Sequence, residues 1–181
     1  MNGGVRRKVF ISYHQNDKDE VEDFCSTFDY ERDVCITRAL GVGMEQDIID
    51  STNTDYVMRR IREAYLKDST VTIALIGKCT WARRYIDWEI QASLRHGEIV
   101  TPNGLIGIVL PSAGRQPIPP ERLKMNLKGD NNEEGYARYY WYPQRKDQLL
   151  SWLDDAFNAR TNRPYLIENP RDNFKYNRTC P

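Results

Sequence analysis

The chain has 181 residues, of which 40% are hydrophobic and 29% charged, a composition typical of a globular protein. Its 26 Lys and Arg residues balance its 26 Asp and Glu residues, so no net field attracts nucleic acid or an acidic membrane surface. No apolar run reaches the ~18 residues of a membrane span, which predicts a soluble protein. A chain of this length has the size of one core, and we expect a single domain over residues 1–163. The tail, 164–181, is expected to pack on this domain or to be partly disordered.

Four cysteines are spread along the sequence without a C-x-x-C pair: Cys25, Cys35, Cys79 and Cys180. The N-terminal segment lacks the apolar stretch of a signal peptide, so we expect a cytoplasmic protein whose cysteines are reduced thiols. The 2 histidines lie far apart in the sequence, and no metal site is expected.

The first predicted strand, Val9–Ser12, is a short apolar run that contains β-branched residues. A helix is predicted from Lys18 to about Arg32, because apolar side chains recur there at spacings of three and four. Residues 33–37 predict a second strand. The loop from Ala39 to Asn53 contains glycines and offers little to bury, so we expect no helix or strand in it.

The middle of the chain repeats the order of helix, strand, helix and strand. Asn53 or Thr54 is suited to cap the next helix, whose apolar residues share one face. Residues 70–76 are the clearest strand of the sequence. The helix after it carries an apolar stripe and is expected to end at Gly97, and residues 105–110 predict a fourth strand.

Prolines and glycines crowd residues 111–135, which predicts a long excursion with one short turn of helix near Arg122. A fifth strand within 137–142 and a final helix around 149–157 follow it. Strands that alternate with helices predict an α/β, flavodoxin-like domain of three layers. Its five-stranded parallel sheet would have the order 2-1-3-4-5, with helices on both faces.

In such sheets, ligands bind beyond the carboxyl ends of the strands, at the point where the strand order reverses. Here this switch point lies between the loop Tyr13–Asp17 and the loop Gly77–Trp81. A phosphate-binding loop would need glycines after the first strand, and this loop has none. A phospho-acceptor domain would need an acidic pair at that place, where the chain has Ser12 and Tyr13.

The segment beside this crevice carries the most chemical information. Trp81, Tyr85 and Glu89 recur at four-residue spacing, which predicts that they share one face of a helix. Glu89 then either pairs with a neighbouring arginine on a solvated face or reaches the crevice. A helix that begins at Thr80 would put Glu89 ~13 Å along its axis, too far from the strand ends. A site at the crevice therefore predicts a later start, near Arg83.

Two segments of the sequence resemble the TIR domain family. The first, similar to the family's opening strand and loop, is Val9-Phe10-Ile11-Ser12-Tyr13 followed by Asp17. The second, similar to the family's W-x-x-x-E-[IL] helix, is Arg84-Tyr85-Ile86-Asp87-Trp88-Glu89-Ile90. Tyr85 stands in the place of the tryptophan, and Glu89 in that of the catalytic glutamate. The pattern R-R-[WY]-x-x-x-E-[IL], which begins at Arg83, is most similar to the TIR-like (ThsB-type) proteins of bacterial Thoeris antiphage defence.

The resemblance implies an enzyme that cleaves NAD at the nicotinamide glycosidic bond. It also implies release of a cyclic ADP-ribose isomer that activates a downstream effector. NAD is then a substrate, and no cofactor is expected. One carboxylate suffices, because nicotinamide leaves as a neutral ring and needs no general acid. In this scheme Glu89 is the catalytic residue and stabilises the positive charge that grows on the ribose. The substrate-binding residues would be Ser12, Tyr13, His14, Trp81 and Tyr85.

Two other functions are compatible with the same sequence. One is a non-catalytic TIR-like interaction module in signal transduction, which would bind further copies or a partner through the loop Ala39–Asn53 and the helices beside it. The other is a nucleoside glycosyl-transferring enzyme of similar fold. Self-association through TIR-like surfaces would be compatible with the enzyme as well as with the module.

Overall fold

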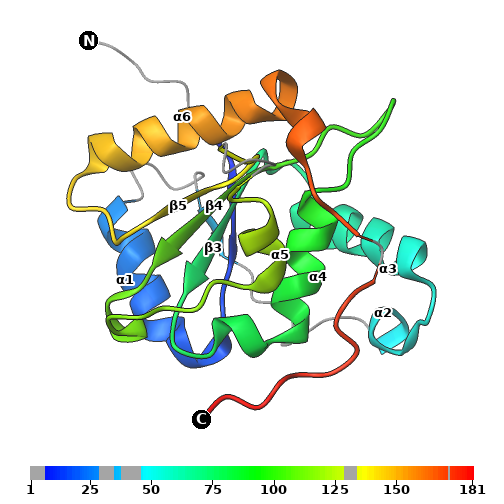
Figure 1. The fold of residues 1–181 in the computed structure, drawn as a ribbon, viewed down its shortest axis with the longest axis horizontal. Coiled ribbons are helices and arrows are strands. Elements are labelled where there is room, and N and C mark those ends of the chain that lie inside the picture. The colour runs from blue at the N-terminus through cyan, green and yellow to red at the C-terminus, as the bar shows by residue number, and fades with distance from the viewer. Residues whose placement is uncertain (1–6, 29–34, 38–45, 129–133, 171) are drawn as a thin grey trace.

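The computed structural model of the protein describes residues 7–28, 35–37, 46–128, 134–170 and 172–181 (Figure 1). Several predicted features lie outside these residues. They are the end of the first predicted helix, the glycines of the loop after the second strand and the tip of the proline-rich excursion.

The described residues contain a sheet whose paired strands are all parallel, in the order β2-β1-β3-β4-β5. The strands are β1 (Val9–Ser12), β2 (Cys35–Thr37), β3 (Val71–Ile76), β4 (Gly104–Val109) and β5 (Arg138–Tyr140). Every residue of β1, β3 and β4 is buried, which is why these strands are nearly continuous apolar runs. The predicted α/β fold with a parallel sheet and helices is confirmed.

The helices are α1 (Lys18–Phe28), α2 (Gln46–Asp50), α3 (Thr54–Ile61), α4 (Arg84–Ser93), α5 (Glu121–Met125) and α6 (Lys146–Asn162). A π-helical turn, Arg62–Leu66, extends α3. Short 3₁₀ turns lie at Gln15–Asp17, Thr80–Ala82, Pro111–Ala113 and Pro164–Leu166. Asn53 is the residue that caps α3, because its side-chain oxygen accepts a hydrogen bond from the Tyr56 amide at 3.1 Å.

Helices cover both faces of the sheet (Figure 1). On one face, α1 and α6 pack against side chains of β1, β3 and β4, including Ile11, Ile73 and Ile108. On the other face, α2, α3, α4 and α5 pack against the alternate residues of the same strands, such as Phe10 and Ile76. The chain therefore leaves β1 toward one face and β3 toward the other, which creates the switch point between these two strands.

Two predictions about helices were wrong, one for the segment before α3 and one for the end of α4. The helix α2 lies in the segment expected to be a loop, because Ile48 is fully buried and packs with Phe10 in the core. Gly97 does not end α4, which stops at Ser93 with Leu94 as its C-terminal cap. The Ser93 carbonyl accepts a hydrogen bond from the Asn103 amide at 2.8 Å, which joins the end of α4 to the residue before β4 and leaves Gly97 in the loop between them.

Cys79 and Cys180 form a disulfide across 101 positions of sequence. The prediction of reduced thiols is therefore wrong for these two cysteines, because the C-terminal segment returns to the loop after β3. Among the described residues, we find no helix with the length and apolar character needed to cross a membrane. The cytoplasmic location remains a prediction.

Candidate active site

The loops that follow β1 and β3 are joined by hydrogen bonds at the switch point. The Gly77 amide donates to Thr80 Oγ1 at 2.9 Å, and this hydroxyl donates to Asp17 Oδ2 at 3.5 Å. Burial raises the pKa of Asp17 and the nearby Glu20 raises it further, whereas the hydrogen bond from Thr80 lowers it. The two walls of the predicted crevice are thus held together at one end by the partly buried hydrogen bond between Thr80 and Asp17.

Glu89 lies under this crevice and is fully buried, at 0% exposure. Its carboxylate accepts a hydrogen bond from the hydroxyl of Ser12, the last residue of β1. The alternative in which Glu89 pairs with an arginine on a solvated face is therefore wrong. Because α4 begins at Arg84 rather than Thr80, Glu89 lies only ~8 Å along the helix axis and reaches the end of β1.

A cavity of about 190 Å³ opens at the carboxyl end of β1, and the fully buried Ser12 and Glu89 are not among the residues that line it. Tyr13 and His14 of the loop after β1 line one wall, while Tyr85 and Arg83 line the other. Burial raises the pKa of the Tyr13 hydroxyl, and Glu22 and Glu89 raise it further while Lys18 lowers it. Three of the predicted binding residues, Tyr13, His14 and Tyr85, therefore share one cavity. The carboxylate of Glu89 is close enough to Tyr13 to raise the pKa of its hydroxyl.

His14 is held as a neutral imidazole. Its Nδ1 accepts a hydrogen bond from the Asn16 amide at 2.9 Å, which caps the short turn Gln15–Asp17. Burial lowers the pKa of His14, and the positive charge of Arg83 lowers it further. With Nδ1 occupied as an acceptor, the proton of the neutral ring sits on Nε2, which makes this nitrogen a donor.

Tyr85 is positioned by its neighbours on α4. The Arg84 guanidinium lies 4.7 Å from the centre of the Tyr85 ring and donates to the Tyr85 hydroxyl at 2.7 Å. The ring also meets Trp88 edge to face at 5.6 Å. Trp81 is placed differently: it belongs to the 3₁₀ turn before α4 and is not among the residues that line the 190 Å³ cavity. The expectation that Trp81 shares a helix face with Tyr85 and Glu89 is therefore wrong.

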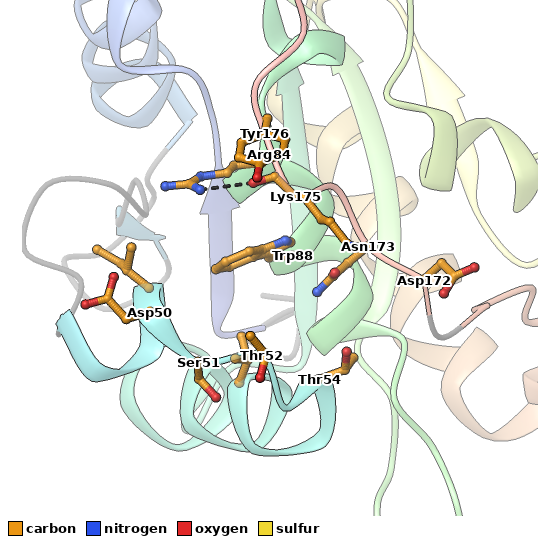
Figure 2. Close-up of a pocket in the computed structure, with 12 residues that line it drawn as sticks. Asp50, Ser51, Thr52, Thr54, Arg84, Trp88, Asp172, Asn173, Lys175 and Tyr176 are labelled. Atoms are coloured by element: carbon orange, nitrogen blue, oxygen red, sulfur yellow. Dashed lines mark hydrogen bonds between the residues drawn. The ribbon is translucent and has the colours of Figure 1, made fainter.

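A larger cavity, of about 760 Å³, is lined by Arg84 and Trp88 of α4 (Figure 2). Residues 49–52 of α2 and the following loop, with Thr54 and Val57 of α3, also line it. The remaining wall comes from Asp172, Asn173, Lys175 and Tyr176 of the C-terminal segment. Arg84 does not line the 190 Å³ cavity, whose wall includes its neighbours Arg83 and Tyr85.

Sequence reasoning missed the buried ion pair that connects α4 to the C-terminal segment. Arg122 Nε donates to Asp87 Oδ1 at 2.8 Å, with side-chain exposures of 4% and 5%. Arg122 also donates to the carbonyls of Pro170 and Asp172, at 2.8 and 2.6 Å. Asp87 Oδ2 accepts from the Phe174 amide at 2.9 Å. The pair therefore anchors the C-terminal segment beside the helix that carries Glu89.

Comparison with known protein families gives a match. Residues 10–115 match the model of the TIR-like domain of the Thoeris protein ThsB. The chain belongs to this family. A search of curated proteins found no match. The ThsB-type resemblance indicated by the sequence is thus confirmed, and it identifies a TIR-like domain of Thoeris defence.

The ThsB match spans the elements that build the candidate site. Both the Ser12–Glu89 pair and the cavity walls formed by Tyr13, His14 and Tyr85 fall within it. The helices α5 and α6 and the C-terminal segment lie beyond the matched residues of this ThsB-family chain.

Proposed function

We propose that this TIR-like domain cleaves NAD at the nicotinamide glycosidic bond and releases a cyclic ADP-ribose isomer as a signal for a downstream effector. The observation that carries the proposal is the pairing of Glu89 with Ser12 at the switch point, beside the cavity lined by Tyr13, His14 and Tyr85. Membership of the ThsB family supports it, because that family is part of Thoeris defence.

The proposed chemistry needs one anionic group in a site that excludes water. When the bond between the ribose C1′ and the nicotinamide nitrogen breaks, both bonding electrons go to the cationic ring, which leaves neutral. Positive charge then develops on the ribose, and a carboxylate such as that of Glu89 stabilises it. A second nucleophile of the same ligand attacks C1′ to give a cyclic product, whereas attack by water gives linear ADP-ribose.

The other residues have binding roles in this proposal. The Ser12 hydroxyl orients the Glu89 carboxylate, and the ring of Tyr85 offers a face on which a nucleobase or nicotinamide stacks. Neutral His14 offers Nε2–H as a hydrogen-bond donor to a phosphate oxygen. Trp81, which lies in the 3₁₀ turn before α4, is given no role in this scheme.

A non-catalytic interaction module is the second candidate, and one observation favours it. Glu89 is completely buried, as expected of a carboxylate that joins α4 to β1 through Ser12 for structural reasons. In that case neither NAD nor its products are turned over, and the exposed surfaces of the domain bind a protein partner.

Incubation of the purified protein with NAD, with and without extract from phage-infected cells, separates the two candidates. Nicotinamide and cyclic products are measured for the wild type and for Glu89→Gln, with Glu98→Gln as the matched control because Glu98 is exposed. Loss of the carboxylate is expected to reduce nicotinamide release by at least ~100-fold, as for other groups that stabilise transition-state charge. Equal release by wild type and Glu89→Gln would contradict the catalytic role.

A further inference from the structure

The C-terminal residues 172–181, called the strap below, lie along the first half of α4. The Phe174 carbonyl accepts a hydrogen bond from Trp88 Nε1 at 2.8 Å. The Lys175 carbonyl accepts one from Arg84 at 3.1 Å, which Figure 2 shows as a dashed line. The Arg178 amide donates to the Ala82 carbonyl at 2.8 Å. The strap therefore contacts the helix that carries Glu89 over its first turns.

The strap also supplies the N-terminal cap that α4 lacks in its own sequence. Arg83 occupies the cap position, and its side chain makes no capping hydrogen bond. Instead, Asn177 Oδ1 accepts a hydrogen bond from the Arg84 amide at 3.0 Å. This contact satisfies one of the four amides that the start of a helix leaves without a partner. The strap therefore contributes one capping hydrogen bond to the start of α4.

With the strap in place, the candidate active site is too small for its proposed substrate. Pockets that bind small molecules measure about 300–1,000 Å³, whereas the cavity beside Tyr85 measures about 190 Å³. Asn177 of the strap lines that cavity, and other strap residues line the 760 Å³ cavity. Withdrawal of the strap would remove a wall from both cavities.

Phe174 is anchored by Asp87, but beyond it the non-covalent contacts of the strap are those of a segment that detaches readily. Lys175 to Thr179 are exposed, and Tyr176 is 79% exposed. Its hydrogen bonds to Arg84 of α4 are exposed. Such bonds are individually weak in water, and chain ends fray unless they are tied down. The tie is the disulfide between Cys180 and Cys79, two half-exposed residues that a thiol can reach.

We propose that the Cys79–Cys180 disulfide is a redox-sensitive latch that holds the strap over the candidate active site, and that its reduction opens the site. A dithiol reductant, small or protein-borne, donates two electrons and two protons. The S–S bond breaks, both cysteines become thiols, and the reductant becomes a disulfide. In a reducing cytoplasm, the location predicted from the sequence, such a bond is transient and suited to sensing. This inference deepens the proposed function and rests on it for its effect on catalysis.

The test compares the full-length protein, purified without reductant, before and after treatment with dithiothreitol. Hydrogen exchange measured by mass spectrometry reports on the strap and on the start of α4, while nicotinamide release from NAD reports on the site. Cys180→Ser removes the latch, and Cys25→Ser is the matched control because it keeps the disulfide. Reduction is expected to speed exchange in the strap of the wild type and of Cys25→Ser, with β3 unchanged. Cys180→Ser is expected to exchange rapidly in both conditions.

Nicotinamide release is expected to rise at least ~10-fold on reduction of the wild type, if the oxidised site is open in a tenth of the molecules or fewer. Cys180→Ser is expected to match the reduced wild type without reductant. Equal strap exchange before and after reduction would overturn the latch. So would alkylation of both Cys79 and Cys180 in protein purified without reductant. If no form cleaves NAD while strap exchange still responds to reduction, the proposed function fails and the latch stands.

Discussion

Removal of the Arg122 side chain is expected to destabilise the fold more than any loss of a surface charge. Its guanidinium lies within the excursion after β4, in a buried ion pair with Asp87 of α4 at 2.8 Å. In Arg122→Ala the Asp87 carboxylate would stay buried without its counter-charge. Breaking a buried pair from one side costs about 3–5 kcal/mol. We expect the lower half of this range, because the Phe174 amide still donates to Asp87.

Urea and thermal unfolding followed by circular dichroism measure this loss. A loss of about 3–4 kcal/mol lowers the melting temperature of a chain of this length by about 6–16 °C. Arg145→Ala is the matched control and is expected to leave the melting temperature unchanged, because both side chains of the Arg145–Asp147 pair are 70% exposed. The double variant Arg122→Met with Asp87→Leu is expected to lose less than the sum of the two single losses. An Arg122→Ala variant as stable as Arg145→Ala would refute the reasoning.

Two further predictions concern packing and pH. Gly104→Ala is expected to cost ~1–3 kcal/mol in urea unfolding, because the new Cβ would overlap the Ala156 backbone of α6. Gly97→Ala, where nothing lies within 4 Å, is the control, and equal stability of the two variants would contradict this. The pKa of His14 is lowered in the folded protein, mainly by burial. The contribution of neutral His14 to the free energy of unfolding is therefore complete above the unfolded pKa of ~6.5. It is lost as the pH falls from there through the lower folded pKa, because the unfolded chain is protonated first. His14→Asn retains an acceptor for the Asn16 amide and is expected to lose less stability between pH 7.5 and pH 5 than the wild type. An equal loss of stability in the two proteins would refute the lowered pKa of His14.

The central strands could be predicted because burial on both faces makes them apolar throughout. The run that predicted Val9–Ser12 is β1 with the same bounds, and β3 and β4 begin within one residue of their predicted positions. The edge strand β5 is shorter than predicted, because its residues Arg138–Tyr140 are only half-buried and pair on one side. The helix α2 escaped prediction because a five-residue helix presents too few apolar positions to show a period.

Two parts of the candidate site were predictable, because each has a local sequence pattern: the strand that ends at Ser12 and the helix that carries Glu89. The order of the strands then places these two parts side by side. Ser12 and Glu89 are 77 positions apart, and only the parallel order of β1 and β3 brings the strand end and the helix together. The partners of Asp87 were not predictable, because Arg122 lies in a proline-rich segment with no period and the strap has no regular structure. The same absence of local pattern hid the approach of Cys180 to Cys79.

The most direct test of the central claim is a comparison of NAD binding with nicotinamide release in Glu89→Gln, using protein reduced beforehand to free the strap. The glutamine can still accept a hydrogen bond from Ser12, so the variant is expected to fold and to bind NAD with the affinity of the wild type. Its kcat for nicotinamide release is expected to fall by at least ~100-fold. An unchanged kcat in a variant that binds NAD normally would contradict the role proposed for Glu89.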